Sequence, residues 1–358
     1  MSWQLRIEPT GQTVEVSEDQ SLLDACLRAG IWLPHACCHG LCATCKVRVL
    51  DGEVDHGDAS PFALMDFERE EGQTLACCAR PQSDLVIEAE LDEDPDALGL
   101  PVQDFIGTVV RIEPLTPTVK AFHLRLDRPM QFQPGQYVNL EVPGLGERRA
   151  FSIASAPQEV AATQTIELQV RLVPGGAGTT ALHQRVQVGD TLNLAGPYGR
   201  FFVRRSAHGA GGVPLLFIAG GSGLSSPRSM VLDLLASGCP QPITLVVGQR
   251  HRAELYGHEE FLALMQQHPQ FTYLPVLSDE PADSGWSGCR GYAHEAARTE
   301  FAGDFRGRKA YLCGPPAMVE ACLSTLMQGR LFERDIHTES FLSAADAQRL
   351  RSPVFRSV

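Results

Sequence analysis

Apolar and polar residues alternate along Trp3–Ile7 and Thr13–Val16, on either side of a Pro9–Thr10–Gly11 turn. Alternation with a period of two predicts strands, and the turn residues between them predict a hairpin. Ser21–Ala29 instead has its apolar residues at helical spacing and precedes a glycine, which predicts a short helix. Together these elements predict a small α+β sheet domain at the start of the chain. Two further strands are expected at Lys46–Leu50 and Leu85–Ala89.

The pattern changes twice further along the chain. Between Gly107 and about Val203, short strands separated by turns predict an antiparallel barrel. From Pro214 onward, apolar strands alternate with helical stretches, which predicts a parallel sheet of βαβ units. Asp92–Pro101 is acidic, contains prolines and a glycine, and is expected to be a linker. The chain is therefore expected to be multidomain, with domains at residues 1–95, 103–205 and 210–345. The barrel strands are expected at Thr108–Ile112, Lys120–Leu126, Tyr137–Val142, Ile166–Leu172 and Thr191–Leu194, and the parallel strands at Leu215–Ala219, Ile243–Val247 and Ala310–Cys313.

The composition is that of an ordinary globular protein. Of the 358 residues, 44% are hydrophobic and 20% are charged, which argues against disorder. The longest strongly apolar run, Val213–Gly221, has about half the length of a membrane span, and no signal peptide is expected at the N-terminus. Six of the eleven cysteines lie within Cys37–Cys78. We expect a cytoplasmic chain whose gathered thiols bind a metal rather than form disulfides.

Acidic residues are concentrated in the first domain. Residues 1–95 hold 6 Lys+Arg and 19 Asp+Glu, a net charge of −13, whereas the whole chain holds 30 and 43. The remaining residues therefore hold 24 of each and are neutral overall. Nucleic acid and an anionic membrane would both repel the first domain. Its charge is either a solvated face or a docking face for a basic protein partner.

The cysteine spacing predicts an iron–sulfur cluster. Cys37, Cys42 and Cys45 form C-x4-C-x2-C, and Cys77 follows after 31 residues, which is the plant-type [2Fe–2S] spacing. A tight loop can supply three thiolates and a distant strand end the fourth, while small loop residues let backbone N–H groups approach the sulfurs. A zinc site is the alternative, but zinc sites usually show paired C-x2-C knuckles and only one such pair is present. A Rieske centre would need two histidines in place of thiols, and the histidines that flank this loop replace none.

Two neighbouring cysteines compete for the place of the fourth ligand. Leu75–Ala76–Cys77 resembles the Leu-Ala-Cys at the fourth ligand of similar ferredoxins, which favours Cys77 over Cys78. Cys78 is then expected to be a buried, inert thiol. Cys38 stands where related proteins often have glycine, so a positive φ at this position would cost some strain.

Two motifs in the barrel region resemble those of the ferredoxin–NADP reductase superfamily. Arg149–Ala150–Phe151–Ser152 matches Arg-x-(Tyr/Phe)-Ser, in which the arginine can pair with a flavin phosphate and the serine can reach the reactive ring nitrogen. Gly175–Gly176–Ala177–Gly178–Thr179 resembles the loop whose backbone N–H groups bind the FAD pyrophosphate at a helix start, which favours FAD over FMN. Without this context, Arg149 would be read as a surface ion pair and Phe151 as a core residue. The resemblance implies an FAD site made of Arg149, Phe151, Ser152, Gly175, Gly176 and Thr179.

The third domain carries the expected NADH site. Gly220–Gly221–Ser222–Gly223 follows an apolar strand and opens a helix, where glycines allow close approach of a pyrophosphate and the helix N-terminus favours the anion. Cys313–Gly314–Pro315 ends another strand, and the resemblance places the cysteine beside the nicotinamide ring. Arg250 lies in a segment that adjoins the nucleotide in relatives; it could meet a 2′-phosphate, although relatives with arginine here use NADH. Phe341 either shields the flavin ring, as an aromatic residue does in relatives, or packs in the core. The resemblance thus implies catalytic positions for Ser152, Cys313 and Phe341.

The order of ferredoxin, flavin barrel and nicotinamide domain covers essentially the whole chain. In this order and in several stretches the chain is similar to the reductase components of multicomponent phenol hydroxylases, and also to those of toluene and methane monooxygenases. The resemblance implies a β-grasp ferredoxin, an FAD-binding barrel and an NADH-binding α/β domain that pass electrons to a diiron hydroxylase. The stretches are Ala59–Met65, Phe132–Leu140, Gly220–Pro227 and Leu326–Asp335.

Two other functions are also consistent with the sequence. The reductase of a Rieske ring-hydroxylating dioxygenase shares the architecture, and the phenol-hydroxylase-like stretches weigh against it. A passive ferredoxin carrier or redox sensor would show no NADH-driven dye reduction. The sequence does not name the aromatic substrate, because a reductase never touches it, and it does not indicate the oligomeric state.

Overall fold

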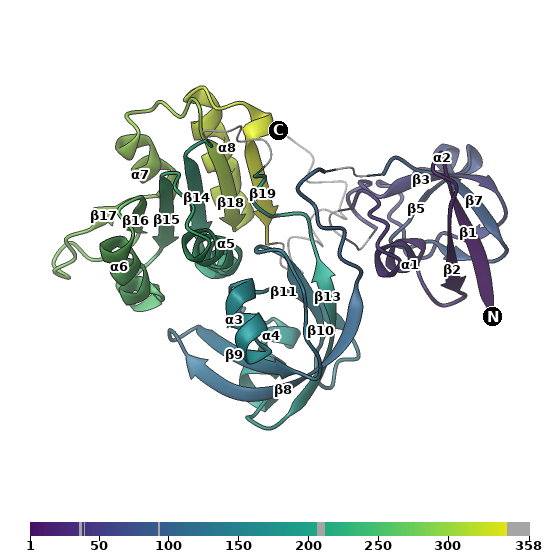
Figure 1. Cartoon of the computed structure of the whole chain (residues 1–358), viewed down its shortest axis with the longest axis horizontal. Helices are drawn as coiled ribbons and strands as arrows, with labels where there is room; N and C mark the ends of the chain where they lie inside the picture. The colour runs from purple at the N-terminus through teal and green to yellow at the C-terminus, as the bar shows by residue number, and fades with distance from the viewer. Residues whose placement is uncertain (36–37, 39, 92–93, 206–211, 342–358) are drawn as a thin grey trace. The chain divides into compact units, whose positions relative to one another are not determined.

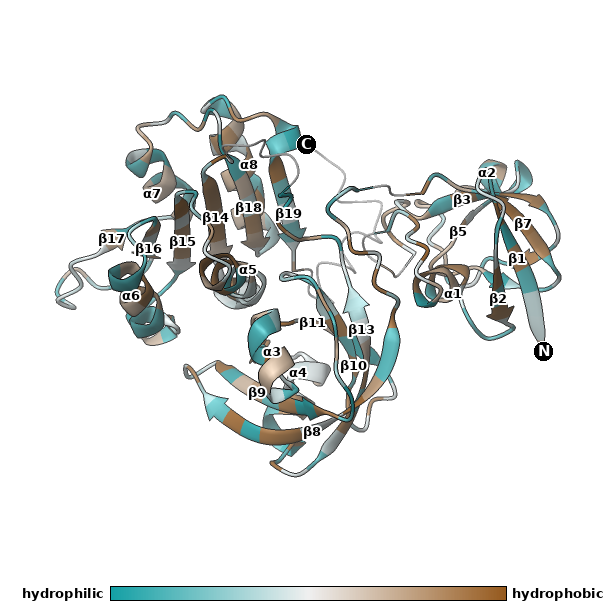
Figure 2. Cartoon of the chain, viewed as in Figure 1, coloured by the Kyte–Doolittle hydropathy of each residue, from teal (hydrophilic) through white to brown (hydrophobic). Residues whose placement is uncertain are grey.

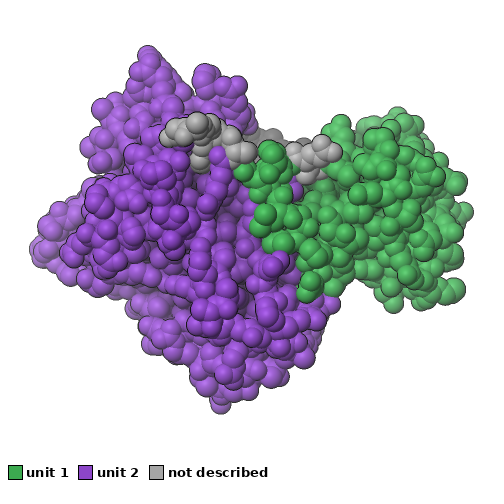
Figure 3. All heavy atoms as spheres, viewed as in Figure 1, with its two compact units in different colours: residues 1–103, 343–358 green, residues 104–342 purple. Residues whose placement is uncertain are grey.

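The computed structural model describes residues 1–35, 38, 40–91, 94–205 and 212–341. The chain divides into two compact units, Met1–Gln103 and the residues from Asp104 to Phe341 (Figure 3). The acidic first domain that was expected at residues 1–95 lies in the first unit, and the expected barrel and nucleotide domains share the second. Cys37, the first expected cluster ligand, and residues 342–345, the end of the expected third domain, lie outside the described residues.

The first unit is built on a five-stranded sheet with the order β2-β1-β7-β3-β5 (Figure 1). β1 pairs antiparallel with β2, as the expected hairpin, and parallel with β7. Helix α1 (Leu22–Arg28) begins after Ser21, whose side chain accepts the N–H of Asp24, and it buries its apolar residues. The β-grasp prediction is confirmed. The strands are β1 (Ser2–Glu8), β2 (Gln12–Ser17), β3 (Lys46–Asp51), β5 (Gln73–Leu75) and β7 (Leu85–Glu88), with the short pair β4 (Val54–Asp55) and β6 (Arg80–Pro81) beside them.

The barrel of the second unit is a six-stranded sheet with the order β11-β10-β13-β8-β9-β12. The sheet curls until its two ends meet at an antiparallel bridge between Ile153 and Leu168, and alternate residues of its strands form the enclosed core. The antiparallel barrel is confirmed. Helix α3 (Pro157–Thr163), which the sequence did not indicate, follows β11, and α4 (Ala177–Arg185), whose start was expected at the Gly175–Thr179 loop, follows β12. The strands are β8 (Gln103–Pro114), β9 (Val119–Leu126), β10 (Tyr137–Glu141), β11 (Arg148–Ser152), β12 (Thr165–Arg171) and β13 (Thr191–Tyr198).

The rest of the second unit is a parallel sheet with the order β17-β16-β15-β14-β18-β19. Its central strands are buried on both faces and appear brown in Figure 2. Successive residues of these strands point into two separate cores, one with α5 and α6 and the other with α7 and α8, as a parallel sheet covered on both sides requires. The elements are β14 (Leu215–Gly220), α5 (Ser225–Ala236), β15 (Ile243–Gln249), α6 (His258–Gln267), β16 (Phe271–Leu277), β17 (Cys289–Arg290), α7 (Ala293–Glu300), β18 (Lys309–Gly314), α8 (Pro316–Gln328) and β19 (Ile336–Ser340).

Three strands of this sheet, β16, β17 and β19, were not expected. Pro275 interrupts the apolar run of β16, and β19 is an edge strand with polar, partly exposed residues. Both features weaken the pattern that identifies a buried strand. Among the described helices, none combines the length and apolar character that a membrane span requires.

Candidate functional site

The glycine turn after β14 packs tightly against the end of β18. A Cβ at Gly223 would lie 2.5 Å from the carbonyl oxygen of Cys313, and one at Gly314 would lie 3.0 Å from that of Gly220. A Cβ at Gly220 would overlap the sulfur of Met318. Gly223 and Gly314 are therefore required where the backbone contacts itself, whereas the end of the Met318 side chain could move away from a Cβ at Gly220. From the sequence, Gly220 and Gly223 were explained only by the approach of a nucleotide.

Gly221, in contrast, faces a cation. It has a φ of +58°, and its Cβ position lies 3.1 Å from Nη1 of Arg171 at the end of β12. The guanidinium of Arg171 makes no hydrogen bond or ion pair with the residues that the structure describes. The Gly221 carbonyl oxygen accepts hydrogen bonds from Tyr256 Oη at 3.1 Å and Gln249 Nε2 at 3.3 Å, which fixes the turn. A cation beside a glycine turn at a helix start is a suitable donor set for a dinucleotide phosphate.

Cys313 and Glu339 lie opposite each other on the paired strands β18 and β19. The buried Cys313 Sγ donates to Glu339 Oε2 at 3.6 Å, and Ser226 Oγ donates to the same oxygen at 3.0 Å. Burial raises the pKa of Glu339 to about 7, although both hydrogen bonds lower it. Burial also raises the pKa of the Cys313 thiol. The site therefore contains a carboxyl group that can take up or release a proton near neutral pH.

The expected flavin residues of β11 face different surroundings. Ser152 is 8% exposed and pairs with Tyr137, whose ring stacks on Tyr198 with centroids 5.6 Å apart. Phe151 is partly buried against the barrel core. Arg149 is half-exposed and forms an ion pair with Glu147. Phe151 thus packs in the core and Arg149 forms a surface ion pair, which are the two ordinary contacts that were considered above as alternatives to flavin binding.

The glycine loop before α4 lies beside Arg149. The Cβ position of Gly178 is 3.5 Å from Cγ of Arg149, and Gly176 is the N-cap residue of α4. Thr179 Oγ1 accepts the N–H of Val173 at 3.1 Å, so this hydroxyl group closes the loop. The first N–H groups of a helix have no partner within the helix. Together with the neighbouring guanidinium they are a donor set that fits the pyrophosphate of FAD.

Four other expected site residues lie at the margins of these groups. The N–H of Phe341 donates to the Gly314 carbonyl at 3.0 Å, and its ring packs against the core on the α5 side. Arg250 is exposed after β15, and its carbonyl accepts the N–H of Asp279 at 2.9 Å. Pro315 is the N-cap residue of α8 and Ser222 is half-buried in the glycine turn. A flavin-shielding role of Phe341 stays a prediction.

The thiols of Cys45 and Cys77 are hydrogen-bonded to each other. This bond and burial raise the pKa of Cys45. In Cys77 the same bond lowers the pKa, but a bond to Cys78 and burial outweigh it and raise the pKa to about 12. Backbone N–H groups of Cys77 and Gly40 donate to Cys45 and Cys77 respectively. Paired, enclosed thiols that receive N–H bonds fit the sulfur ligands of a cluster, since a bound metal would favour their thiolate forms.

The surroundings of the other cysteines of the loop fit a cluster site only in part. Cys42 is exposed, and within the described residues no three Cys, His or acidic side chains gather as a metal site. Cys78 is half-buried rather than buried, and its sulfur lies 2.7 Å from the Cβ position of Gly40. Cys38 has a φ of +54°, so the strain expected for a residue in place of glycine is present.

The segment after the loop exposes a mixed acidic and apolar surface. α2 (Asp66–Glu70) buries none of its residues, and the N–H of Ser60 ties the segment to the loop through the Gly40 carbonyl at 3.0 Å. Glu70 and Glu71 are exposed, whereas Glu68 binds Lys46 at 2.5 Å. We define the acidic–apolar segment as Phe62, Met65, Asp66, Phe67, Glu70 and Glu71, all exposed.

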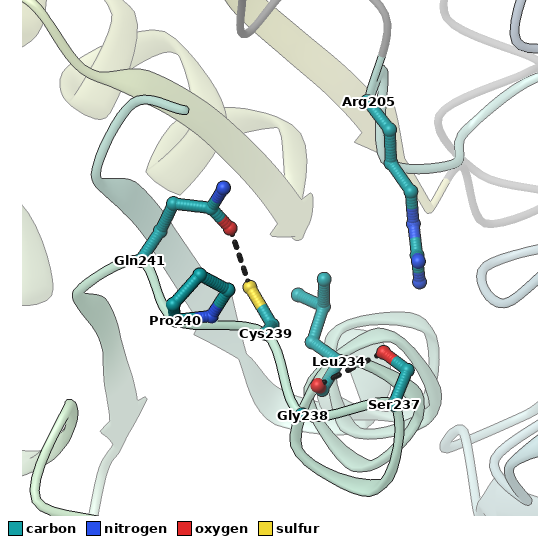
Figure 4. Close-up of a pocket in the computed structure, with 7 residues that line it drawn as sticks. All are labelled: Arg205, Leu234, Ser237, Gly238, Cys239, Pro240 and Gln241. Atoms are coloured by element: carbon teal, nitrogen blue, oxygen red, sulfur yellow. Dashed lines mark hydrogen bonds between the residues drawn. The ribbon is translucent and has the colours of Figure 1, made fainter. Parts of the chain in front are cut away.

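A pocket of about 240 Å³ lies near the C-terminal end of α5 (Figure 4). Cys239 Sγ donates to Gln241 Oε1 at 2.6 Å across one side of it. None of the expected site residues lines this pocket, so its volume does not mark any of the sites described above. Its lining residues are Arg205, Leu234, Ser237, Gly238, Cys239, Pro240 and Gln241.

Comparison with known families divides the chain into three matched regions. Residues 5–82 match the 2Fe-2S iron-sulfur cluster binding domain, residues 90–203 the oxidoreductase FAD-binding domain, and residues 217–324 the oxidoreductase NAD-binding domain. The chain is 55% identical, over the full length of both proteins, to the reductase component of phenol 2-monooxygenase from Pseudomonas sp. strain CF600. The chain belongs to the family of [2Fe–2S] flavin reductases that includes the phenol hydroxylase reductase components.

Solved structures of this family agree with the fold. The cytochrome P450 reductase GcoB of Amycolatopsis superposes with a TM-score of 0.85 at 35% identity, covering 96% of this chain and 99% of that one. The ferredoxin reductase of carbazole 1,9a-dioxygenase superposes with a TM-score of 0.79 at 27% identity, over the same shares. As a member of this family, the chain is an electron-transfer oxidoreductase that uses NADH, FAD and a [2Fe–2S] cluster.

Sequence reasoning missed one residue of the second unit, Glu339, and associated a second, Arg171, only with the flavin motif that follows it. Glu339 completes the group at Cys313, and Arg171 lies against Gly221. Glu339 is a single polar residue on an edge strand and carries no motif. Arg171 precedes the expected flavin loop but belongs, in the structure, beside the nucleotide turn. Only the pairing of distant strands brings either residue to its place.

Proposed function

We propose that this chain is the reductase of an aromatic monooxygenase and passes electrons from NADH to a diiron hydroxylase that acts on phenol or a related compound. The observation that carries the proposal is the 55% identity, without gaps in coverage, to a phenol 2-monooxygenase reductase component. The relatives named for an aromatic O-demethylase and for naphthalene 1,2-dioxygenase are 38% and 30% identical. The acceptor is thus inferred from the relative with the much higher identity.

We assign three groups of residues to three cofactors. FAD is held by Arg149, Phe151, Ser152 and the loop of Gly175, Gly176 and Thr179. NADH is held by the turn Gly220–Gly223 with Arg171, flanked by Arg250, Gly314 and Pro315. The [2Fe–2S] cluster is held by Cys37, Cys42, Cys45 and Cys77. When bound, these groups allow a hydride to be accepted as an electron pair and delivered as single electrons.

The residues of the chain supply orientation and proton handling. The cations Arg171 and Arg149 neutralise phosphates at two helix starts. Cys313 and Ser226 hold Glu339 Oε2 in place. Oxidation of NADH by single-electron acceptors releases one proton, and the Glu339 carboxylate, whose pKa is raised to about 7, can receive it. Backbone N–H groups directed at Cys45 and Cys77 stabilise negative charge on the cluster sulfurs.

Reconstitution with purified partners tests the proposal. The reductase is mixed with NADH, phenol and a diiron phenol hydroxylase, and hydroxylated product is compared with that formed with a Rieske dioxygenase or a cytochrome P450 in place of the hydroxylase. We expect product with the diiron enzyme at a rate at least tenfold above the others. Equal or greater coupling to a Rieske oxygenase or to a cytochrome P450 would contradict the assignment. Absence of NADH-driven dye reduction would instead favour a carrier or sensor.

The cellular compartment of the protein is inferred from the chemistry of the expected cluster cysteines. A cluster site needs reduced cysteines while it assembles, and the cytoplasm keeps thiols reduced. We therefore place the protein in the cytoplasm, and cell fractionation with antibody detection checks this placement.

A further inference from the structure

Helix α5 lies between the parallel sheet and the barrel of the second unit (Figure 1). It follows the glycine turn directly, and one side of its first two turns is polar although it is buried. Ser225, Ser226 and Ser229 are at most 2% exposed, and the Arg228 side chain is 12% exposed. Burying polar groups costs free energy unless each finds a partner. The partners of these four residues therefore indicate what the helix is built to hold.

Two of the three serines donate a hydrogen bond to the barrel region, and the third lies beside it. Ser225 Oγ donates to Gln169 Oε1 at 3.1 Å, and Ser229 Oγ donates to the carbonyl of Ser155 at 2.6 Å. Ser226 Oγ lies 3.4 Å from the Gly135 carbonyl and also donates to Glu339 Oε2. One helix face thus contacts the barrel and the carboxyl group beside Cys313 at the same time.

Arg228 is the charged centre of this contact. Its Nη1 donates to the carbonyl of Ala154 at 2.7 Å and lies 3.4 Å from Glu167 Oε2 on β12. Its Nε and Nη2 form a two-bonded fork with the carboxylate of Glu260 on α6, at 2.8 and 2.7 Å. The planar guanidinium therefore joins a strand end of the barrel to a helix of the nucleotide domain, which a lysine ammonium cannot do with the same geometry.

The charge of Arg228 is secured by its neighbours. Burial alone would lower the pKa of this guanidinium, but the carboxylates of Glu167 and Glu260 outweigh burial and raise it. Glu167 is itself held by Gln169, whose Nε2 donates to Glu167 Oε1 at 2.8 Å. Ser225, Gln169, Glu167, Arg228 and Glu260 form one continuous chain of polar contacts across the two domains.

The place where Arg228 binds the barrel matters for the reaction. Ala154 and Ser155 follow Ser152 by two and three residues, so Arg228 and Ser229 bind the chain just beyond the expected flavin serine. The same helix begins at the nucleotide turn and holds Glu339 through Ser226. Hydride transfer requires the reacting atoms to be about 3–3.5 Å apart, and a misplacement of about 1 Å can cost roughly 100-fold in rate.

We propose that Arg228 is a positioning residue for hydride transfer: its fork to Glu260 and its bond to the Ala154 carbonyl hold the flavin strand end in register with the nicotinamide site. The inference rests on the proposed function, because it concerns the transfer from NADH to FAD. Arg228 acts through its protein partners, Glu260 and the Ala154 carbonyl. Its loss should slow the transfer step while leaving the binding of NADH and FAD largely in place.

Rapid-mixing kinetics of the FAD-loaded full chain separate these effects. For Arg228→Lys we expect the limiting rate constant of flavin reduction by NADH to fall about tenfold or more, with the apparent Kd for NADH changed less than about twofold. The long-wavelength absorbance of stacked nicotinamide and flavin should weaken in the same variant. Hydrogen exchange of peptides that cover residues 152–169 should become faster. The matched control is Arg306→Lys, an exposed arginine whose side chain pairs with Asp304, and it should change none of these readouts.

Ser229→Ala and Glu260→Gln test the same contact with less disturbance, should Arg228→Lys not fold. Each should lower the limiting rate constant with little change in Kd. The proposal is overturned if these variants reduce flavin at the rate of the unmodified protein, or if the apparent Kd rises while the limiting rate constant stays the same. A chain without any substitution that fails to reduce FAD with NADH would refute the proposed function itself, which is a separate result.

Discussion

The cluster loop and the nicotinamide site are built in opposite ways. The expected cluster ligands come from one loop and from one strand end that 31 residues separate from it in the chain, and Cys45 and Cys77 meet through contacts within the first unit. The nicotinamide site that we propose takes Gly221 from a turn, Arg171 from the barrel and Glu339 from the last strand of the sheet. A site whose ligands lie mostly in one loop can be recognised from residue spacing. A site assembled from distant elements can be recognised only once their pairing is known.

The first prediction tests the local site and has the largest expected effect. Cys45→Ser should lower the iron content from about two per chain to near zero, because Cys45 is buried against Cys77 and no other buried thiol of the described loop can replace it. FAD content and NADH-to-dye transfer should persist, since the flavin and nucleotide residues lie in the other unit. Iron analysis and visible absorbance measure both.

The neighbouring cysteine is the control for this prediction. Cys78→Ser should retain iron, because the hydrogen bond from Gly40 and the pairing with Cys45 both fall on Cys77. A chain that loses its iron with Cys78→Ser but keeps it with Cys77→Ser would reverse the assignment of the fourth ligand.

The same contrast explains what could be predicted from the sequence. The parallel sheet and the barrel were recognised because β14, β15 and β18 are mostly apolar and the barrel strands are short and separated by turns. β16 was missed because Pro275 breaks its pattern, and β19 because its residues alternate in exposure at a sheet edge. Glycines were found as a motif, but their physical reason differs: Gly223 is needed where the turn touches Cys313. Glu339 and Arg228 could not be found, since their importance lies in contacts between elements far apart in the chain.

The second prediction concerns the assembled site and its buried carboxyl group. The pKa of Glu339 rises from 4.5 to about 7 on folding, so the folded protein binds this proton more tightly than the unfolded chain does. Its contribution to stability is fully present below about pH 4.5 and is lost as the pH rises through 7. The loss is on the order of 3 kcal/mol. Glu339→Gln cannot titrate and should not show it.

Urea unfolding of the FAD-free protein at pH 5 and pH 8 measures this pH-dependent contribution of Glu339 to stability. The free energy of unfolding of the unmodified chain minus that of Glu339→Gln should be lower at pH 8, by about 2–3 kcal/mol. Taking the difference cancels the other titrating groups. A difference that is equal at the two pH values would mean that the carboxyl group is not desolvated as the structure indicates.

The third prediction asks whether the acidic charge of the first unit is used for docking. Glu68 lies close to the exposed acidic residues in the sequence, but its carboxylate binds Lys46 and the N–H of Met65, so its reversal would disturb the fold. Reversal of the exposed pair, Glu70→Lys with Glu71→Lys, should lower electron delivery to the hydroxylase about tenfold at low salt. NADH-to-dye turnover needs no docking and should stay the same.

Two controls distinguish docking from general charge. Glu15→Lys changes an equally exposed acid on β2 and should have less effect. Added salt shortens the Debye length from about 10 Å at 0.1 M to about 3 Å at 1 M, so it should lower delivery to the hydroxylase much more than dye turnover. If both activities respond to salt in parallel, the acidic surface is only a solvated face.

The last prediction contrasts two arginines near the nucleotide turn and has the smallest expected effect. Arg250 is exposed, and an exposed ion pair contributes about 0.2–1 kcal/mol, so Arg250→Gln should lower kcat/KM for NADH by about two- to fivefold. Arg171 lies against Gly221, and Arg171→Gln should have a clearly larger effect.

The choice between NADH and NADPH depends on a nearby carboxyl group. Glu280 accepts the N–H of Arg252 at 2.7 Å, and this contact lowers the pKa of the carboxyl group. Glu280 lies three residues beyond β16, and its carboxylate would repel a 2′-phosphate bound beside it, so we expect NADH to be preferred over NADPH with and without Arg250. If Arg250→Gln selectively abolishes turnover with NADPH while NADPH is the better substrate of the unmodified protein, then Arg250 binds the 2′-phosphate and the preference for NADH is wrong.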